Sequence, residues 1–198
     1  MRSKSAVNLR AGAPCLAALV LLLALPANTS AGAAAGAVPR EFAERFTPFV
    51  ATPYSVVDKM LELAGVGPQD TVYDLGSGDG RIVIAAAQKF GARAVGVEIR
   101  SELWKHSSEE IARFGLEKRV RILHDDMFEV NVGAATVVTL YQLGAVNDRL
   151  RPRLEKGLRP GARVVSVDFS ISGWTPTKTL RVRAENGNEY KLYLYVRP

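Results

Sequence analysis

Apolar residues in this chain recur with two different periods that take turns along the sequence. Short, nearly continuous apolar runs of the kind that form buried strands stand at Val72–Leu75, Ala94–Val97, Val120–Leu123, Ala135–Tyr141 and Arg163–Phe169. Apolar residues at helical spacing follow Pro53, Arg81, Ser101 and Ala145. Strands that alternate with helices form a sheet with helices on both faces, so the pattern predicts a doubly wound α/β domain.

Two further strands are predicted near the C-terminus, at Leu180–Ala184 and Tyr190–Val196. They flank Glu185-Asn186-Gly187-Asn188, a run of turn residues that is typical of a tight hairpin. Consecutive strands joined by a tight turn are antiparallel. The fold class predicted is therefore a mostly parallel, seven-stranded sheet with a C-terminal antiparallel hairpin.

The first forty residues have a different character from the rest of the chain. Three basic residues come first, and the apolar run Cys15–Leu25 and a stretch of small residues follow. A basic start, an apolar run and small residues together favour a secretory signal peptide. The run is short for a bilayer span, which takes about 20 apolar residues; an uncleaved membrane anchor is the alternative.

This leader leads to two expectations. Residues 1–38 are predicted to be a signal peptide or N-terminal membrane anchor with a linker, and residues 39–198 to form the folded domain. The protein is expected to be exported or membrane-anchored, in the bacterial periplasm or inner membrane.

Charge and cysteine content exclude some classes of function. The net charge is +6, and three of the positive charges belong to the leader, which leaves a mild +3 for the remainder. Its basic residues are scattered without aromatic neighbours, so they form no nucleic-acid stripe. Cys15 is the only cysteine, so the domain has no disulfide and no thiol nucleophile.

The most informative stretch is Val72–Ile84, a buried strand, a glycine-rich turn and the start of a helix. Glycines at Gly76, Gly78 and Gly80 let the backbone turn sharply and approach a ligand closely. The free N–H groups of the helix start favour a nucleotide-type cofactor. The nicotinamide fingerprint fails, because Arg81 stands where its third glycine is required.

The run Asp-x-Gly-x-Gly-x-Gly that begins at Asp74 resembles the first motif of the class I S-adenosylmethionine-dependent methyltransferases. In that family the loop cradles the methionine moiety of S-adenosyl-L-methionine. The resemblance implies a Rossmann-like methyltransferase domain with cofactor-binding residues in the loop: Asp74, Gly76, Ser77, Gly78 and Gly80. The alternative is a tight turn without a ligand.

Three more residues are candidates for cofactor binding. Glu98 ends the second strand, where an acid can accept hydrogen bonds from both ribose hydroxyls; a solvated acid before the helix is the alternative. Asp126, after the third strand, resembles the family's adenine-side residue better than Asp125 does. Thr52 suits a helix cap before Pro53, unless the loop Phe49–Pro53 folds over the cofactor.

A closer resemblance rests on four segments in order, which are Phe49–Pro53, Asp74–Val83, Val137–Tyr141 and Trp174-Thr175-Pro176. They are similar to the small protein-lysine methyltransferases of the ATP synthase c-subunit and adenine nucleotide translocase type and their bacterial relatives. The resemblance implies a protein-lysine N-methyltransferase whose partner is a protein substrate, and a membrane protein is the expected kind. The bacterial relatives usually have Leu-Pro within 142–144, so the acceptor remains open.

Residues at the ends of the fourth and fifth predicted strands, together with Trp174, are candidates for the site that binds the methyl acceptor. No Asp/Asn-Pro-Pro-aromatic run follows the fourth strand, which disfavours nucleic-acid bases as acceptors. Neutralising a lysine at pH 7 costs roughly 4–5 kcal/mol, and an apolar channel lowers that cost by desolvating the ammonium. Tyr141, Trp174 and Phe169 are candidates to line the channel, and Asp168 to take or orient the proton. Core packing of Trp174 and Phe169 and a strand-end hydrogen bond of Asp168 are the alternatives.

No metal site is predicted, because His106 and His124 are isolated and lack ligand-like spacing. Two other functions compete with protein-lysine methylation. One is methylation of nitrogen or oxygen in a small molecule, which would need a closed pocket. The other is a catalytically lapsed scaffold that still binds the cofactor.

Overall fold

The computed structural model describes residues 49–198. The boundary predicted between residues 38 and 39 lies outside them, so this division of the chain stays a prediction. The predicted location, exported or anchored in a membrane, has to be corrected. Among residues 49–198, no helix has the length and apolar character needed to cross a bilayer.

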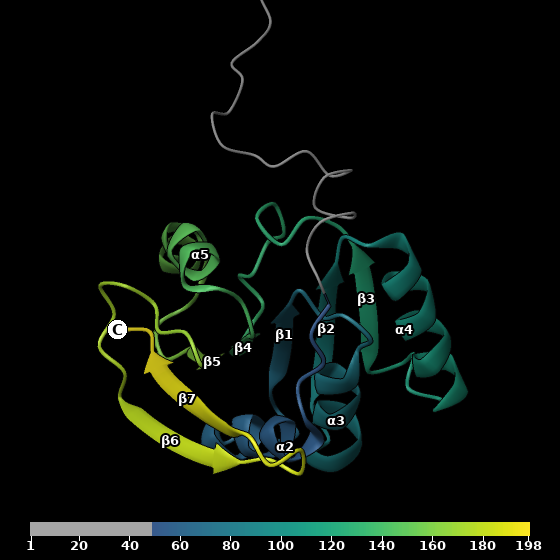
Figure 1. Cartoon of the computed structure of the whole chain (residues 1–198). Helices are drawn as coiled ribbons and strands as arrows, with labels where there is room; N and C mark the ends of the chain where they lie inside the picture. The colour runs from purple at the N-terminus through teal and green to yellow at the C-terminus, as the bar shows by residue number, and fades with distance from the viewer. Residues whose placement is uncertain (1–48) are drawn as a thin grey trace, which may run out of the picture. The chain divides into compact units, whose positions relative to one another are not determined.

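Seven strands form one sheet in the order β3-β2-β1-β4-β5-β7-β6 (Figure 1). The strands are β1 (Thr71–Leu75), β2 (Arg93–Glu98), β3 (Val120–His124), β4 (Val137–Leu140), β5 (Arg163–Val167), β6 (Lys178–Arg183) and β7 (Glu189–Val196). Neighbours from β3 through to β5 are parallel, whereas β7 is antiparallel to both β5 and β6. The predicted fold class is confirmed, with one refinement: β7 inserts beside β5, so β6 is the edge strand.

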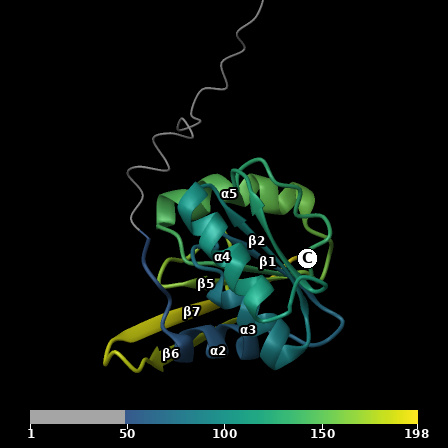
Figure 2. The same cartoon turned by 90° about the vertical axis from the view of Figure 1, so that its right-hand side faces the viewer.

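Helices cover both faces of the sheet. They are α2 (Tyr54–Leu63), α3 (Arg81–Phe90), α4 (Ser101–Arg113) and α5 (Gly144–Gly157). Side chains of α2, α3 and α4 join one core cluster, and those of α5 join the other. Figures 1 and 2 accordingly show α5 on one side of the sheet and α2 and α3 on the opposite side.

The central strands are apolar on both faces because both faces are covered. Along β1, Val72 packs into the cluster of α2 and α3, while Tyr73 and Leu75 pack into that of α5. Successive side chains of a strand point to opposite faces, so a strand between two helix layers has to be apolar throughout. This explains why the sequence shows continuous apolar runs here.

The strand order also determines where a ligand can bind. The chain moves outward from β1 through β2 to β3 and then returns to place β4 on the other side of β1. Connections therefore leave the carboxyl ends of β1 and β4 in opposite directions and open a crevice between them. The glycine-rich turn after β1 lies at this crevice.

Candidate active site

A cavity of about 370 Å³ lies at the carboxyl ends of the central strands. Its walls come from the turn after β1, the ends of β2 and β4, the segments after β3 and β5, and the residues before α2. The predicted site residues found in its lining are Thr52, Asp74, Gly76, Ser77, Gly78, Glu98, Asp126 and Tyr141. Tertiary structure thus brings together residues as far apart in sequence as Thr52 and Tyr141.

The glycine-rich turn can approach a ligand only because it lacks side chains. Gly76 and Gly78 have φ angles of +86° and +56°, values that L side chains rarely adopt. A Cβ on Gly76 would lie 2.2 Å from the Gln142 amide nitrogen. The turn is also held in place, because the N–H groups of Gly76 and Ser77 both donate to the Val97 carbonyl at 2.9 Å.

Two polar groups of the lining have hydrogen-bonding capacity left over. The Ser77 hydroxyl is buried and has no partner among the described residues. The Glu98 carboxylate accepts one bond from the Gly78 N–H and one from the Arg100 N–H, each at 2.8 Å. A carboxylate has about four acceptor positions, so Glu98 retains room for a pair of hydroxyls. These groups fit the polar parts of S-adenosyl-L-methionine.

Asp74 is a buried acid in the wall of this cavity, with 3% of its surface exposed. The Thr139 hydroxyl donates to its Oδ1 at 2.8 Å. Burial raises the pKa of Asp74 to about 7, the negative charges of Glu98 and Asp79 add to the rise, and the Thr139 hydrogen bond opposes it. A cationic group bound here would favour the ionised form of Asp74.

The flank after β3 combines an acid with apolar side chains. The Asp126 carboxylate accepts a hydrogen bond from the Phe128 N–H at 2.9 Å. Met127 and Phe128 line the same flank, and the Arg149 guanidinium lies 4.0 Å from the centre of the Phe128 ring. Asp125 also borders the cavity. Apolar walls beside a hydrogen-bonding acid suit a flat heterocycle such as adenine.

Gly80 has a different role from the other two glycines. It precedes α3 with a φ angle of +80° and is absent from the cavity lining. A Cβ there would lie 3.0 Å from the Ser107 Cβ of α4. The structure therefore places Gly80 where α3 packs against α4, and gives it no exposure to the cavity.

On the acceptor side, Tyr141 lines the cavity at the end of β4. Its ring meets that of Tyr190 edge to face, with 6.4 Å between the centroids. Burial, followed by the charge of Asp168 and the neighbouring Tyr190, raises the pKa of the Tyr141 hydroxyl above its usual 10. The hydroxyl therefore stays protonated at neutral pH. Phe169, which is 37% exposed, also borders the cavity.

Two predicted catalytic residues are not brought to the cavity. Asp168 accepts a hydrogen bond from the Lys191 N–H at 2.8 Å and donates its own N–H to the Lys191 carbonyl at 2.7 Å. The Trp174 indole donates to Glu155 at 2.8 Å and packs edge to face on Tyr195. Asp168 makes the strand-end contact weighed as its alternative, and Trp174 packs away from the channel it was expected to line.

Thr52 is placed differently from a helix cap. It is 5% exposed and lines the cavity, while α2 begins after Pro53 without a side-chain cap of its own. We call residues Phe49–Thr52 the strap. The Phe49 ring of the strap occupies the space that a Cβ at Gly78 would need, since its Cε2 would be 2.3 Å away. The loop before α2 therefore folds over the glycine-rich turn.

Among the contributors to the cavity that sequence reasoning missed are Arg81 and Gln142. The Arg81 guanidinium pairs with Asp79 and donates to the Thr52 carbonyl at 2.8 Å. The Gln142 amide donates to the Leu75 carbonyl at 3.1 Å and borders the turn. The Asp79–Arg81 ion pair could have been predicted, because the two residues are only two positions apart. No local signal linked Gln142 to the turn, because Gly76 is sixty-six positions away.

His124 packs against an aromatic ring and the backbone. His124 stacks on Trp104 with 4.8 Å between ring centroids, and one of its ring nitrogens lies 3.1 Å from the Ile99 carbonyl. Within residues 49–198, no three potential metal-binding side chains of His, Cys, Asp or Glu gather at one place.

Comparison with known proteins indicates the family of the chain. Residues 74–178 match the family model described as ANTKMT methyltransferase domain. A "Protein-lysine N-methyltransferase" of Saccharolobus islandicus is 48% identical over 150 residues, which are 75% of this chain and 92% of that protein. A lysine N-methyltransferase of the ATP synthase c-subunit from Rattus norvegicus is 35% identical over 68% of this chain, but only 60% of the rat protein is covered.

A solved structure is similar over the same region. It is described as an RNA methyltransferase from Salinibacter ruber in complex with S-adenosyl-L-homocysteine, and it is 46% identical. The alignment covers 75% of this chain and 94% of the other, with a TM-score of 0.71. The names of these similar proteins agree on methyl transfer and differ on the acceptor.

Proposed function

This chain belongs to the family of the ANTKMT methyltransferase domain, and we propose that its cavity presents S-adenosyl-L-methionine to a lysine side chain of a protein. The chain is an S-adenosylmethionine-dependent methyltransferase. The name of the Saccharolobus islandicus relative, protein-lysine N-methyltransferase, supports lysine as the acceptor. The observation that carries the proposal for the site is the make-up of the cavity. Glycines and acids line the cavity, and so do Tyr141 and Phe169; we assign the first group to the cofactor and the second to the acceptor.

We assign cofactor binding to two kinds of lining residue: glycines, whose backbone can approach a ligand closely, and polar residues with unused hydrogen-bonding groups. Gly76 and Gly78 admit the methionine moiety, and the buried Ser77 hydroxyl beside them has no partner within residues 49–198. Asp74 places a negative charge near a cationic group of the cofactor, while Glu98 accepts hydrogen bonds from the ribose hydroxyls. S-adenosyl-L-methionine, when bound, supplies a methyl group on a positively charged sulfur.

The acceptor end has to hold a neutral amine beside that methyl group. Burial of the lysine ammonium among Tyr141, Phe169 and Leu143 disfavours its charged form and so lowers its pKa. The Tyr141 hydroxyl stays protonated and can accept a hydrogen bond from the amine, which aligns the nitrogen lone pair for attack. Correct orientation of two reactants is itself a large part of the rate enhancement available to such an enzyme.

We further propose that the acceptor lysine belongs to an apolar stretch of its protein. Large apolar side chains are exposed beside the cavity, with Val50 62% and Leu143 63% open to solvent. Apolar side chains exposed together mark a surface that binds another apolar surface. A lysine flanked by apolar residues would cover them as it enters.

RNA is the second candidate acceptor, because the Salinibacter ruber structure is described as an RNA methyltransferase. A base-modifying enzyme has to hold an unstacked base against aromatic or apolar walls, and Tyr141 and Phe169 would serve that purpose as well. The segment after β4 reads Tyr141-Gln142-Leu143 and lacks a Pro-Pro-aromatic run, which favours lysine.

The experiment that distinguishes the acceptors is transfer from methyl-labelled S-adenosylmethionine to a cell extract, followed by mass spectrometry. We expect the label on lysine ε-nitrogen in protein. Label that disappears with ribonuclease would support RNA, and label in metabolites would support a small-molecule enzyme. Tight cofactor binding without any transfer would support the scaffold alternative, and each of these three results contradicts our proposal.

Replacement of Tyr141 by Phe tests the acceptor end separately. Loss of one hydrogen bond to the amine should lower kcat roughly 5- to 30-fold, while the Kd for the cofactor stays unchanged. Tyr193→Phe is the matched control, because Tyr193 lies on β7 outside the cavity lining. Equal kcat for Tyr141→Phe and wild type would remove Tyr141 from the mechanism.

A further inference from the structure

Helix α2 begins beside the cavity, yet no side chain of the described residues just before it caps its first N–H groups. Its N-cap is Pro53, which makes no side-chain hydrogen bond to the helix. The first N–H groups of a helix have no partner within the helix, so some other acceptor has to satisfy them. Here that acceptor comes from the far end of the chain.

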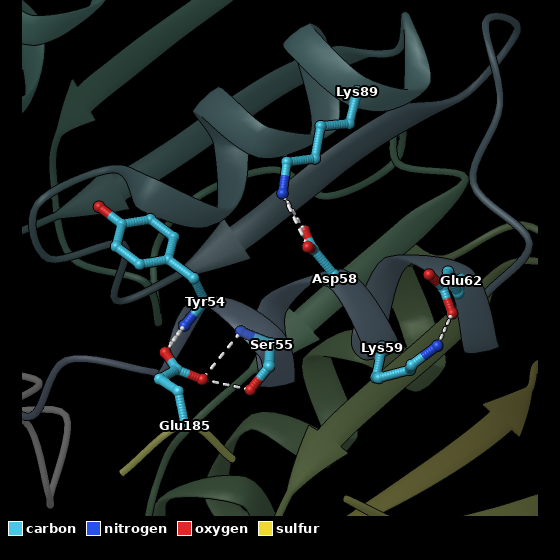
Figure 3. A network of polar contacts seen from close by, with 7 residues as sticks. All are labelled: Tyr54, Ser55, Asp58, Lys59, Glu62, Lys89 and Glu185. Atoms are coloured by element: carbon cyan, nitrogen blue, oxygen red, sulfur yellow. Dashed lines mark hydrogen bonds and ion pairs between the residues drawn. The ribbon is translucent and has the colours of Figure 1, made fainter.

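Glu185, at the tip of the β6–β7 hairpin, supplies the cap (Figure 3). Its carboxylate accepts hydrogen bonds from the Tyr54 N–H at 2.7 Å and the Ser55 N–H at 3.2 Å, and also from the Ser55 hydroxyl. Tyr54 and Ser55 stand 131 and 130 positions before Glu185 in the chain. The hairpin is thus fastened to the helix immediately after the strap.

The capped end of α2 connects directly to the wall of the cofactor cavity. The Arg81 guanidinium lies 4.8 Å from the centre of the Tyr54 ring, and the same group donates to the Thr52 carbonyl at 2.8 Å. Arg81 in turn pairs with Asp79 of the glycine-rich turn. Tyr54, Thr52 and the turn therefore hold one another in a continuous set of contacts.

We propose that Glu185 is a positioning residue for the cofactor: by capping α2 from the hairpin, it fixes the strap over the glycine-rich turn. Much of the strap is open to solvent, since Val50 is 62% and Phe49 41% exposed. Its position depends on where α2 begins, and that is the point at which Glu185 binds. The proposal rests on the cofactor site and not on the identity of the acceptor.

The charge of Glu185 suits this role. Hydrogen bonds from the Ser55 hydroxyl and from backbone N–H groups lower the pKa of Glu185 to about 2. A negative charge at a helix N-terminus is also favoured by the helix dipole. Glu185 is therefore ionised throughout the pH range in which an enzyme works, and its effect on cofactor binding should not vary with pH there.

The test measures cofactor binding by titration calorimetry with S-adenosylmethionine and S-adenosyl-L-homocysteine in the full chain. Loss of a helix cap changes the equilibrium between the ordered and disordered helix end by roughly 3- to 30-fold. Because the strap depends on that helix end, we expect Kd for the cofactor to rise within the same range for Glu185→Ala. The value of kcat at saturating cofactor should stay near that of wild type. Glu185→Gln retains one acceptor oxygen, so its Kd for the cofactor should lie between those of wild type and Glu185→Ala.

Two carboxylates provide matched controls. Asp58 binds Lys89 of α3 through both oxygens at 2.7 Å and so also fastens α2 to a neighbour (Figure 3). Glu189 pairs with Arg181 on the same hairpin as Glu185. Asp58→Asn and Glu189→Gln should leave Kd for the cofactor as in wild type, even where they lower thermal stability.

A double-mutant cycle with Phe49→Ala separates positioning from a general loss of stability. If Glu185 acts through the strap, Glu185→Ala should have little further effect on Kd once the Phe49 ring is gone. Full additivity of the two changes would overturn the proposal, as would wild-type affinity in both Glu185 variants. A fall in kcat with unchanged Kd would overturn it as well.

Discussion

The Asp74 carboxyl shows how one buried side chain can tie stability and cofactor binding to pH. Its pKa is raised from 3.8 to about 7, chiefly by burial. The folded protein therefore holds a proton between about pH 4 and 7 that the unfolded chain has released. Stability contributed by this group is present at low pH and is lost as pH rises through that window. A shift of about three units corresponds to roughly 4 kcal/mol.

Binding of the cofactor should show the opposite dependence. A cationic ligand prefers the ionised Asp74, so affinity should rise with pH up to about 7, and at pH 6 it should be roughly tenfold below its plateau. Calorimetry between pH 5.5 and 8.5, in two buffers that differ in ionisation enthalpy, measures both the affinity and the protons released. Asp74→Asn should abolish the pH dependence. An unchanged profile in that variant would show that another group titrates.

Among the secondary-structure elements, α2 is held at both ends by residues from the C-terminal half. At its start Glu185 provides the cap. At its other end Arg163 of β5 donates to the carbonyls of Ala64 and Gly65, at 2.6 Å and 3.0 Å, and pairs with Asp70. Elements far apart in sequence therefore add to the apolar packing of α2 in fixing this helix beside the cavity.

Replacement of Arg163 tests the second of these attachments. Arg163→Met leaves the Asp70 carboxylate, whose side chain is 14% exposed, without its charged partner. We expect unfolding free energy to fall by roughly 2–3 kcal/mol, below the 3–5 kcal/mol typical of fully buried pairs. Urea denaturation measures this loss.

The exposed pair of Arg181 and Glu189 provides the comparison. Its side chains are 69% and 58% exposed, so Arg181→Met should change stability by about 0.5 kcal/mol or less. Cofactor affinity should survive both substitutions. Equal losses in the two variants would mean that the Arg163 contacts add nothing beyond a surface ion pair.

For the whole molecule, we propose that the folded unit is the domain from residue 39 onward, as the sequence pattern predicts. Every described core residue lies between Val56 and Tyr195, so all the core residues that the structure describes fall inside the predicted domain. A chain that begins near Val38 should unfold cooperatively with the same Tm as the full chain and bind the cofactor equally well. Differential scanning calorimetry of both chains checks this, and a non-cooperative transition in the shorter one would contradict it.

The sequence by itself determined the fold and predicted several strand-end residues that line the cavity. Continuous apolar runs, helical periodicity and turn residues are local signals, and each strand and helix follows from a few neighbouring residues. The glycine-rich turn and Glu98 were predictable because both stand at strand ends, and parallel strands bring their carboxyl ends to one edge of the sheet.

Tertiary structure alone decided which residues meet across the cavity. Trp174 resembled a channel residue in sequence, but its indole finds Glu155 and Tyr195 instead. The sequence left open whether Thr52 is a helix cap or part of a loop over the cofactor, and in the structure Glu185 caps the helix while Thr52 lines the cavity. Gln142 reaches the turn only because β4 pairs beside β1. These contacts join positions far apart in the chain, and they depend on packing that a local pattern does not encode.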